Sequence, residues 1–194
     1  QMKLALIGAT GNVGQRVVAE ALRRGHQVTA IARNVDSVEA RAGIEARKSD
    51  IADEAGLAQT LAGHDAVILS VKFQGLDIEQ VLRAVKTSGV KRLLIVGGAA
   101  SLEVAPGLAL IDTPDFPDFI KVEAEPARQT LNRLRDEQEV DWTFLSPSVF
   151  FGPGERTGKF RLGTDQLLSD AEGKSHISYE DYAVALLDEV ERPR

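Results

Sequence analysis

Three glycines, Gly8, Gly11 and Gly14, lie at every third position near the start of the chain, between an apolar run at residues 3–7 and a pattern of helical period. A strand that turns directly into a helix points unpaired backbone N–H groups at one place, and the helix dipole adds positive potential there. A diphosphate fits such a place if Gly8 allows the tight turn, Gly11 leaves out a Cβ that would block the phosphates, and Gly14 lets the helix pack closely. The pattern predicts a dinucleotide-binding turn, although its G-x-x-G-x-x-G spacing differs from G-x-G-x-x-G and a purely structural glycine turn is the alternative.

Apolar segments typical of buried strands alternate with helical patterns along the chain. Strands are predicted at residues 3–7, 27–33, 44–50, 66–71, 92–98 and 141–145. Helices are predicted from about Val13 to Gly25, over residues 53–63, 76–87 and 179–190, and roughly from Ala127 to Glu139. Such alternation is typical of βαβ units. We therefore expect an α/β fold, a Rossmann doubly wound parallel sheet flanked by helices, as a single NAD(P)-binding domain over residues 1–194.

Two long irregular segments interrupt this rhythm, at residues 99–117 and 146–160. Each follows a predicted strand, and a doubly wound sheet binds its ligand beyond the carboxyl ends of the strands. Loops of this length in compact domains are often binding loops. We expect residues from about 146 to 194 to form a small C-terminal lobe on the substrate side.

The composition limits the classes of partner. The formal net charge of −6, without a clustered basic face, disfavours nucleic acid and anionic membranes. The chain contains no cysteine, which excludes thiolate metal sites and a cysteine nucleophile and favours a reducing compartment. The first apolar run is too short for a signal peptide or a membrane span. We expect a cytoplasmic monomer or homodimer that acts on a small molecule.

The residues after the second predicted strand indicate the kind of dinucleotide. NAD binders of this fold place a carboxylate about 20 residues after the glycines, whereas NADP binders tend to have arginine. Arg33 lies at that position, with no acidic residue until Asp36. A guanidinium can bind a 2′-phosphate through two hydrogen bonds, so NADP(H) is predicted in preference to NAD(H), with a solvated arginine as the alternative. Asp50 and Ile51, after the third strand, either flank the adenine or begin the next helix.

Further cofactor contacts are predicted from topology. The turn contributes Gly8, Ala9, Thr10, Gly11, Asn12, Val13 and Gly14. The fourth strand ends with Ser70, Val71 and Lys72, and the fifth with Gly97, Gly98 and Ala99, so these residues should line the nicotinamide side. A lid over a planar substrate could come from Phe73, Phe116 and Phe119, of which at least one is expected only to pack.

Several phrases of the sequence together resemble one family. They are GATGNVG, Arg33, VGGAASL, WTFLSPSVFFGPGERTG and ISYEDYAVALLDEV. They resemble the atypical, extended-type short-chain dehydrogenases/reductases of the NAD(P)H-binding group, which includes NmrA-like proteins and biliverdin reductase B/flavin reductase-like enzymes. The resemblance covers nearly the whole chain and implies a Rossmann oxidoreductase. It also implies that Pro147, Ser148, Val149 and Phe150 close over the nicotinamide ring; alternatively, Phe150 and Phe151 are ordinary core aromatics.

The catalytic pair of the classical members of that family is missing. They use Tyr-x-x-x-Lys, in which lysine lowers the pKa of the tyrosine so that it exchanges a proton with the substrate carbonyl. Neither Tyr179 nor Tyr182, the chain's two tyrosines, precedes a lysine by four residues. The resemblance makes Lys121 the candidate catalytic and cofactor-ribose residue, with Pro117 at the tyrosine position and a surface lysine as the alternative. Pro126 predicts that a helix through Lys121 kinks or begins at that proline.

The remaining titratable residues give weaker indications. His26 and His64 lie at the amino ends of predicted strands, away from the ligand edge, and are expected to be structural. His176 precedes the last helix without a visible acidic partner. No spacing typical of a metal site is visible. The carboxylates of the last helix, Asp181, Asp188 and Glu189, are expected to be solvated or capping.

Together these features predict an NADPH-dependent reductase that transfers hydride to a small planar acceptor such as a quinone or a flavin. The cofactor carries the chemistry of hydride transfer and the protein supplies positioning. Such acceptors can take their proton from water, so the missing tyrosine is tolerable. The alternative is a non-catalytic NADP(H)-binding redox sensor, as the NmrA resemblance implies. A sugar-nucleotide epimerase or dehydratase is disfavoured, because those reactions need the tyrosine and a larger C-terminal domain.

Overall fold

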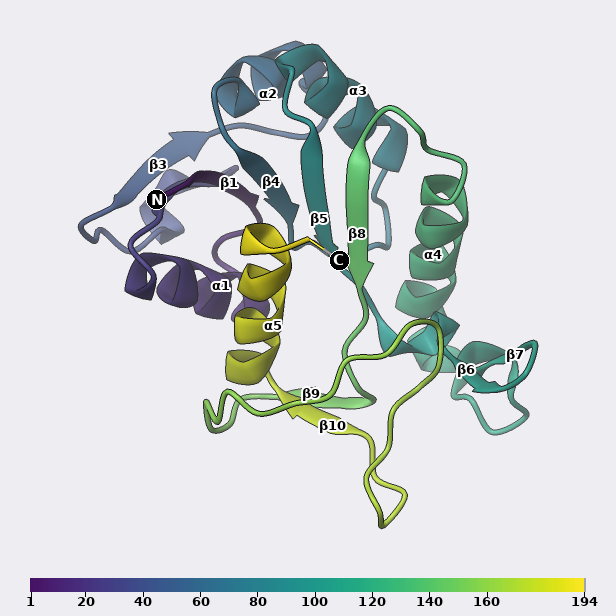
Figure 1. The fold of residues 1–194 in the computed structure, drawn as a ribbon. Coiled ribbons are helices and arrows are strands. Elements are labelled where there is room, and N and C mark those ends of the chain that lie inside the picture. Colours follow the sequence, from purple (N-terminus) through teal and green to yellow (C-terminus); the bar gives the residue numbers. More distant parts are fainter. Residues whose placement is uncertain (194) are drawn as a thin grey trace.

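A parallel sheet of six strands forms the centre of the protein, whose computed structural model describes residues 1–193 (Figure 1). The strands are β1 (Lys3–Ile7), β2 (Gln27–Ala32), β3 (Ile44–Lys48), β4 (Ala66–Leu69), β5 (Arg92–Val96) and β8 (Asp141–Leu145). Their order is β3-β2-β1-β4-β5-β8. The predicted Rossmann doubly wound fold is confirmed, and the direction in which strands are added reverses between β1 and β4.

Helices cover both faces of the sheet. On one face lie α1 (Asn12–Arg23) and α5 (Tyr179–Glu191), and on the other α2 (Glu54–Leu61), α3 (Ile78–Ser88) and α4 (Asp118–Leu134) (Figure 1). Leu4 and Leu6 of β1 belong to the apolar core under α1 and α5, whereas Ala5 and Ile7 belong to the core under the other three helices. This alternation is the period of two that a strand imposes. β4 and β5 are buried along their whole length, as their continuous apolar sequences predict.

Four strands of the sheet end slightly earlier than predicted. β2, β3, β4 and β5 end at residues 32, 48, 69 and 96, one or two residues before the predicted positions. Arg33, Asp50, Ser70 and Gly97 therefore lie just beyond the sheet, at its carboxyl edge.

α4 corrects the prediction for the segment before β8. It runs over Asp118–Leu134 rather than from Ala127 to Glu139, and Pro126 lies inside it. A proline inside a helix leaves the carbonyl four residues earlier, here that of Val122, without its hydrogen bond. Because residues 118–122 are exposed, water can satisfy this carbonyl, and the helix continues through the proline.

The segment at residues 99–117 contains a small hairpin that the sequence did not predict. β6 (Glu103–Ala105) and β7 (Leu108–Ala109) pair in antiparallel register. Gly107, with φ of 75°, lies in the turn between them. The segment is therefore only partly irregular.

The C-terminal segment forms a second small sheet beyond the carboxyl end of β8. β9 (Phe150–Gly152) pairs in parallel with β10 (His176–Ser178), and β10 leads directly into α5. Figure 1 shows this pair below β8, with the long connection between the two strands on the outside. The predicted lobe is thus tied back to the central sheet by α5, which packs against α1.

Candidate functional site

A groove of about 870 Å³ runs along the carboxyl edge of the sheet, from the loop after β2 to the end of β5. It crosses the point between β1 and β4 where the strand order reverses, which is where this fold binds its ligands. The structure brings together here many of the residues predicted to bind the cofactor: Gly8, Thr10, Gly11, Asn12, Val13, Arg33, Asp50, Ile51, Ser70, Val71, Lys72 and Gly97.

The glycines of the first turn are required for different physical reasons. At Gly8 φ is +93° and a Cβ would lie 1.9 Å from the carbonyl oxygen of Ser70, so the turn itself requires glycine. At Gly14 a Cβ would lie 2.2 Å from the carbonyl oxygen of Gly8, so the close approach of the helix requires it. At Gly11 a Cβ would meet only the Gly8 oxygen, at 3.7 Å, which is an ordinary contact. The surrounding residues therefore tolerate a side chain at position 11, whereas a ligand lying on the turn would not.

The first turn of α1 opens onto this groove. Gly11 precedes the helix in an extended conformation, and no side chain among residues 1–193 caps this end with a hydrogen bond. The N–H groups at the start of a helix, together with the helix dipole, attract anions. The turn therefore fits the diphosphate of a dinucleotide.

Arg33 lies at one end of the groove, directly after β2. Its side chain is exposed, and within the described part of the chain it makes no ion pair or hydrogen bond. Most other arginines of the described chain are paired, such as Arg128 with Asp112 at 2.8 Å, with Arg41 and Arg47 as exceptions. The Arg33 guanidinium is therefore free to bind an anionic group of a ligand at this end.

Glu123 of α4 contributes to the groove and was missed by the sequence analysis. Its carboxylate accepts hydrogen bonds from the backbone N–H groups of Phe73 at 2.7 Å and Gln74 at 2.8 Å. It thereby fixes the loop after β4, which forms one wall of the groove. No sequence signal marks Glu123, because its partners lie about 50 residues earlier in the chain.

The other predicted contacts lie outside this groove. Ala9 and Gly14 are buried beside the turn, and Gly98 and Ala99 lie at a short 3-10 turn after β5. Pro147 lines a separate cavity of about 230 Å³, Phe150 lines one of about 1000 Å³, and Val149 is exposed.

Lys121, the candidate catalytic residue, also lies outside the groove. It is exposed on α4, with its Nζ atom 3.4 Å from the Asp118 carboxylate. Two residues on a helix are separated by roughly 200°, so Lys121 and the groove-lining Glu123 point to different sides of α4.

Neither tyrosine points into the groove. Tyr182 is buried and donates its hydroxyl hydrogen bond to the carbonyl oxygen of Leu145 at 2.5 Å, and burial raises the pKa of Tyr182 far above its ordinary value. Tyr179 packs edge-on against Phe151, with ring centroids 4.6 Å apart, and its ring lies 5.3 Å from the Arg16 guanidinium. Both tyrosines therefore serve the packing of α5.

The predicted phenylalanine lid is not assembled. Phe73 is buried and packs on Phe144 with ring centroids 5.7 Å apart, so it is the packing residue that the analysis allowed for. Phe119 is 80% exposed at the start of α4, and Phe116 is half-buried. Phe151 packs in the core, whereas Phe150 is exposed.

His26 and His64 are structural, as predicted, whereas His176 is exposed. His26 accepts from the backbone N–H of Met2 at 3.0 Å and lies 2.6 Å from Glu191. His64 lies 2.7 Å from the Thr29 hydroxyl. His176 does have an acidic partner, because Asp170 lies 3.4 Å away, which corrects the prediction.

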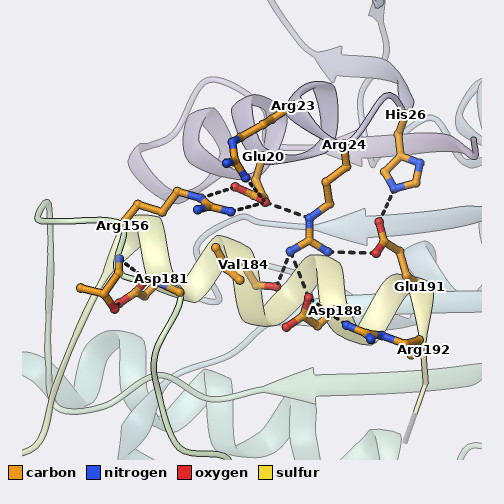
Figure 2. A network of polar contacts seen from close by, with 12 residues as sticks. Glu20, Arg23, Arg24, His26, Arg156, Asp181, Val184, Asp188, Glu191 and Arg192 are labelled. Atoms are coloured by element: carbon orange, nitrogen blue, oxygen red, sulfur yellow. Dashed lines mark hydrogen bonds and ion pairs between the residues drawn. The ribbon is translucent and has the colours of Figure 1, made fainter.

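Buried charges hold the C-terminal segment on α1 (Figure 2). Glu20 of α1, which is 4% exposed, accepts hydrogen bonds from Arg156 at 2.8 and 3.1 Å and from Arg24 at 2.8 Å. Burial alone would raise the pKa of Glu20, but the hydrogen bonds from both arginines outweigh it and hold this pKa below its ordinary value. Figure 2 shows Arg156 reaching Glu20 from the loop that follows β9.

A second carboxylate fixes the same loop. Asp181 of α5 accepts from the backbone N–H groups of Thr157 and Gly158, both at 2.9 Å. Asp181 and Glu189 are buried, so of the two predicted roles, solvated or capping, the solvated one is wrong for these residues. Asp188 is half-buried and lies 3.0 Å from Arg24. The helical period alone did not reveal that α5 is buried on nearly every side.

Residues 1–193 contain neither a metal-binding cluster nor a membrane-spanning helix. No group of histidine and carboxylate side chains there could hold a metal ion. No helix in that range is long and apolar enough to cross a membrane.

Comparison with known proteins identifies the family. The NAD(P)H-binding family model matches residues 8–193. YwnB of Bacillus subtilis (strain 168), described as uncharacterized, is 38% identical over 202 residues, which span 99% of this chain and 93% of YwnB. A candidate epimerase from Bacteroides thetaiotaomicron has a TM-score of 0.93 at 40% identity, covering 100% of this chain and 92% of that one. A candidate NADH-flavin reductase from Streptococcus pneumoniae TIGR4 has a TM-score of 0.86 at 35% identity, covering 100% of this chain and 95% of that one.

The residues of the groove and these comparisons agree with the resemblance carried by the glycine turn and the C-terminal phrases. The chain belongs to the NAD(P)H-binding family, and its central sheet has the Rossmann fold.

Proposed function

We propose that the protein is an NADPH-dependent reductase that passes hydride to a small planar acceptor such as a flavin or a quinone. The observation that carries this proposal is the absence of a side chain at Gly11, which lies in the groove along the carboxyl edge of the sheet. The packing of the protein itself would allow a side chain there. A bound dinucleotide explains the glycine, because a side chain at position 11 would block its phosphates. When bound, the nicotinamide supplies the hydride.

The groove residues have separate roles in this proposal. The N–H groups at the start of α1 bind the diphosphate, and Thr10 and Asn12 add side-chain hydrogen bonds. Asp50 and Ile51 flank the adenine, whereas Ser70, Val71, Lys72 and Gly97 border the nicotinamide. Glu123 keeps the wall after β4 in place through its two backbone hydrogen bonds.

The preference for NADP(H) over NAD(H) rests on Arg33. A charge-assisted hydrogen bond of its guanidinium to the 2′-phosphate is worth about 1.5 to 3 kcal/mol, which is roughly a ten- to hundredfold preference. Arg33→Asp should weaken NADPH binding by that factor and leave NADH binding much less affected, as measured by calorimetry with both nucleotides. Arg41→Asp is the matched control, because Arg41 is an exposed arginine of the same β2–β3 connection that does not line the groove. Equal losses for both nucleotides in Arg33→Asp would contradict the assignment.

The acceptor is proposed because the groove has no tyrosine that could act as an acid or base. Tyr182 is buried on Leu145 and Tyr179 is packed on Phe151, so neither serves a reaction that needs a tyrosine as acid or base. A flavin or quinone needs little beyond positioning next to the cofactor. The name of the Streptococcus relative, a candidate NADH-flavin reductase, supports a flavin, whereas the Bacteroides relative is named as a candidate epimerase. Because Tyr182 is buried and Tyr179 does not line the groove, reduction is favoured over epimerisation. The proposal includes a cytoplasmic location, supported by the absence of cysteine.

The deciding experiment is NADPH oxidation, followed by absorbance, with a panel of quinones and flavins. We expect turnover with at least one planar acceptor. Tight NADPH binding without turnover on any acceptor would contradict the reductase and favour the NADP(H)-binding sensor.

A further inference from the structure

The small sheet beyond β8 presents a paired aromatic ring and imidazole on its outer face. In the parallel register of β9 and β10, Phe150 lies opposite His176 and Phe151 opposite Ile177. Phe151 and Ile177 pack into the core under α5. Because side chains alternate along a strand, Phe150 and His176 both face outward, where they are 69% and 65% exposed.

The position of His176 is set by a carboxylate. Its Nε2 atom lies 3.4 Å from Oδ2 of Asp170. Oδ1 of Asp170 accepts from the backbone N–H groups of Glu172 and Lys174, both at 2.9 Å, and these bonds, the one from Lys174 first, hold the pKa of Asp170 below its ordinary value. The carboxylate is thus ionised and fixed, and Nδ1 of His176 has no partner within residues 1–193. An imidazole oriented by a carboxylate on one nitrogen and open at the other is suited to donate a proton.

Phe150 and His176 share a cavity of about 1000 Å³, which is large enough for a planar bicyclic or tricyclic ring. The same cavity is lined by Ser148, from the segment that connects β8 with β9. β8 is the neighbour of β5, and Gly97, directly after β5, lines the cofactor groove and donates its N–H to the Leu145 carbonyl at 2.9 Å. The cavity therefore lies beyond the carboxyl end of β8, the strand next to β5, whose end borders the groove.

We propose that the outer face of β9 and β10 binds the acceptor, with Phe150 stacking on its ring and His176 supplying its proton. This inference rests on the proposed reductase function. The acceptor receives a hydride, that is two electrons and one proton, from the reduced nicotinamide, which leaves it with an anionic oxygen or nitrogen. The N–H bond at Nδ1 of the His176 imidazolium breaks, the proton goes to that atom, and the neutral imidazole regains a proton from water. The site thus supplies the acid that the missing tyrosine provides in classical members of the family.

Binding can be tested without turnover by NMR, because the chain has three histidines. Oxidised menadione added to the NADP⁺-loaded protein should shift the ring signals of His176, assigned with His176→Gln, and leave those of His26 and His64 in place. Phe150→Ala should weaken the menadione affinity by at least about fivefold, because stacking on an aromatic ring is lost. Phe119→Ala, which removes an exposed phenylalanine outside the cavity, should leave this affinity unchanged. Absence of a His176 shift overturns the inference.

Proton donation is tested by comparing two acceptors with NADPH. Menadione needs a hydride and a proton, whereas the methylene blue cation becomes neutral on taking the hydride alone. His176→Gln should lower kcat with menadione by at least about tenfold and kcat with methylene blue by much less. Imidazole added to His176→Gly should restore part of the menadione rate. An equal loss with both acceptors, or no loss with menadione, overturns the role of His176 while leaving the reductase proposal intact. Failure of the wild-type protein to oxidise NADPH with either acceptor overturns this inference, whereas the reductase proposal is overturned only if no acceptor of the quinone and flavin panel is reduced.

Discussion

The glycine turn at residues 8–14 is held by main-chain packing, whereas the loop at residues 153–158, which follows β9, is held by side-chain charges. In the turn, Gly8 and Gly14 allow backbone atoms to approach more closely than any Cβ would permit. In the loop, Arg156 pairs with Glu20, a residue 136 positions earlier, and Asp181 binds two backbone N–H groups. The glycine spacing of the turn is thus visible in one short stretch of sequence, although Gly8 packs against the distant Ser70, whereas the charged partners of the loop are separated by up to 136 positions.

Gly8→Ala should lower the stability most, because the added Cβ would clash with a main-chain atom. A Cβ there would lie 1.9 Å from the Ser70 oxygen, at a φ of +93°. We expect the free energy of unfolding in urea to fall by more than about 3 kcal/mol, from positive-φ strain and overpacking together. Gly25→Ala is the control, since its φ is +85° but no atom lies within 4 Å of the added Cβ, and it should cost about 1 kcal/mol. Similar losses in both variants would show that the contact with β4 is unimportant.

Glu20→Gln should have the next largest effect, because it removes the charge that holds the C-terminal loop. We expect a loss of about 2 kcal/mol in the free energy of unfolding, since two arginines lose their buried partner. Trypsin should also cleave the native variant faster after Arg156 and Lys159. Glu139→Gln is the control, because Glu139 pairs with Lys86 at 3.1 Å but is exposed, and it should change stability by less than about 0.5 kcal/mol. An unchanged rate of cleavage in Glu20→Gln would show that the Glu20 carboxylate does not hold this loop in place.

The same network predicts how acid acts on the protein. Bonds from its arginine partners hold the pKa of Glu20 below its ordinary value against the effect of burial, so the carboxylate stabilises the folded state above the unfolded pKa, near 4.5. This contribution should be lost as the pH falls through the folded pKa. Urea unfolding between pH 7 and pH 3 should therefore show a shallower acid decline in Glu20→Gln than in the wild type. Parallel declines would contradict the role of this carboxylate.

Gly11→Ala should separate binding from stability on the cofactor side. Its Cβ would make only an ordinary contact with the protein, so the free energy of unfolding should stay within about 1 kcal/mol of the wild type. Calorimetry should show NADPH binding weakened by at least about tenfold, because the methyl group occupies the place of the diphosphate. Undiminished NADPH binding would mean that the ligand does not lie on this turn.

Lys121→Met should have the smallest effect. Its ammonium group is exposed beside Asp118 and does not line the groove, so we expect less than about a twofold change in NADPH affinity. Glu123→Gln, two residues away, should cause a larger loss, because its carboxylate holds the loop after β4. A larger loss in Lys121→Met than in Glu123→Gln would support the cofactor-ribose role that the family resemblance implies for Lys121.

The features predicted correctly are those that a short stretch of the sequence shows by its own pattern. β1 and β8 match their predicted bounds, and Gly8 and Gly14 have the packing roles assigned to them. α4 was placed wrongly because its first turns are exposed, so that water can satisfy the Val122 carbonyl freed by Pro126 and the helix can extend on both sides of the proline. That condition depends on burial, which a local pattern does not contain.

The sequence by itself determined the strand–glycine turn–helix unit, the alternation of strands and helices, and the arginine after β2, because each depends on residues within one or two turns of chain. Only the tertiary structure decided that Glu123 supports the groove, that Glu20 binds Arg156, and that Phe150 stands beside His176. These pairs join residues 26 to 136 positions apart, and their energies arise only when the packed sheet and helices bring them together.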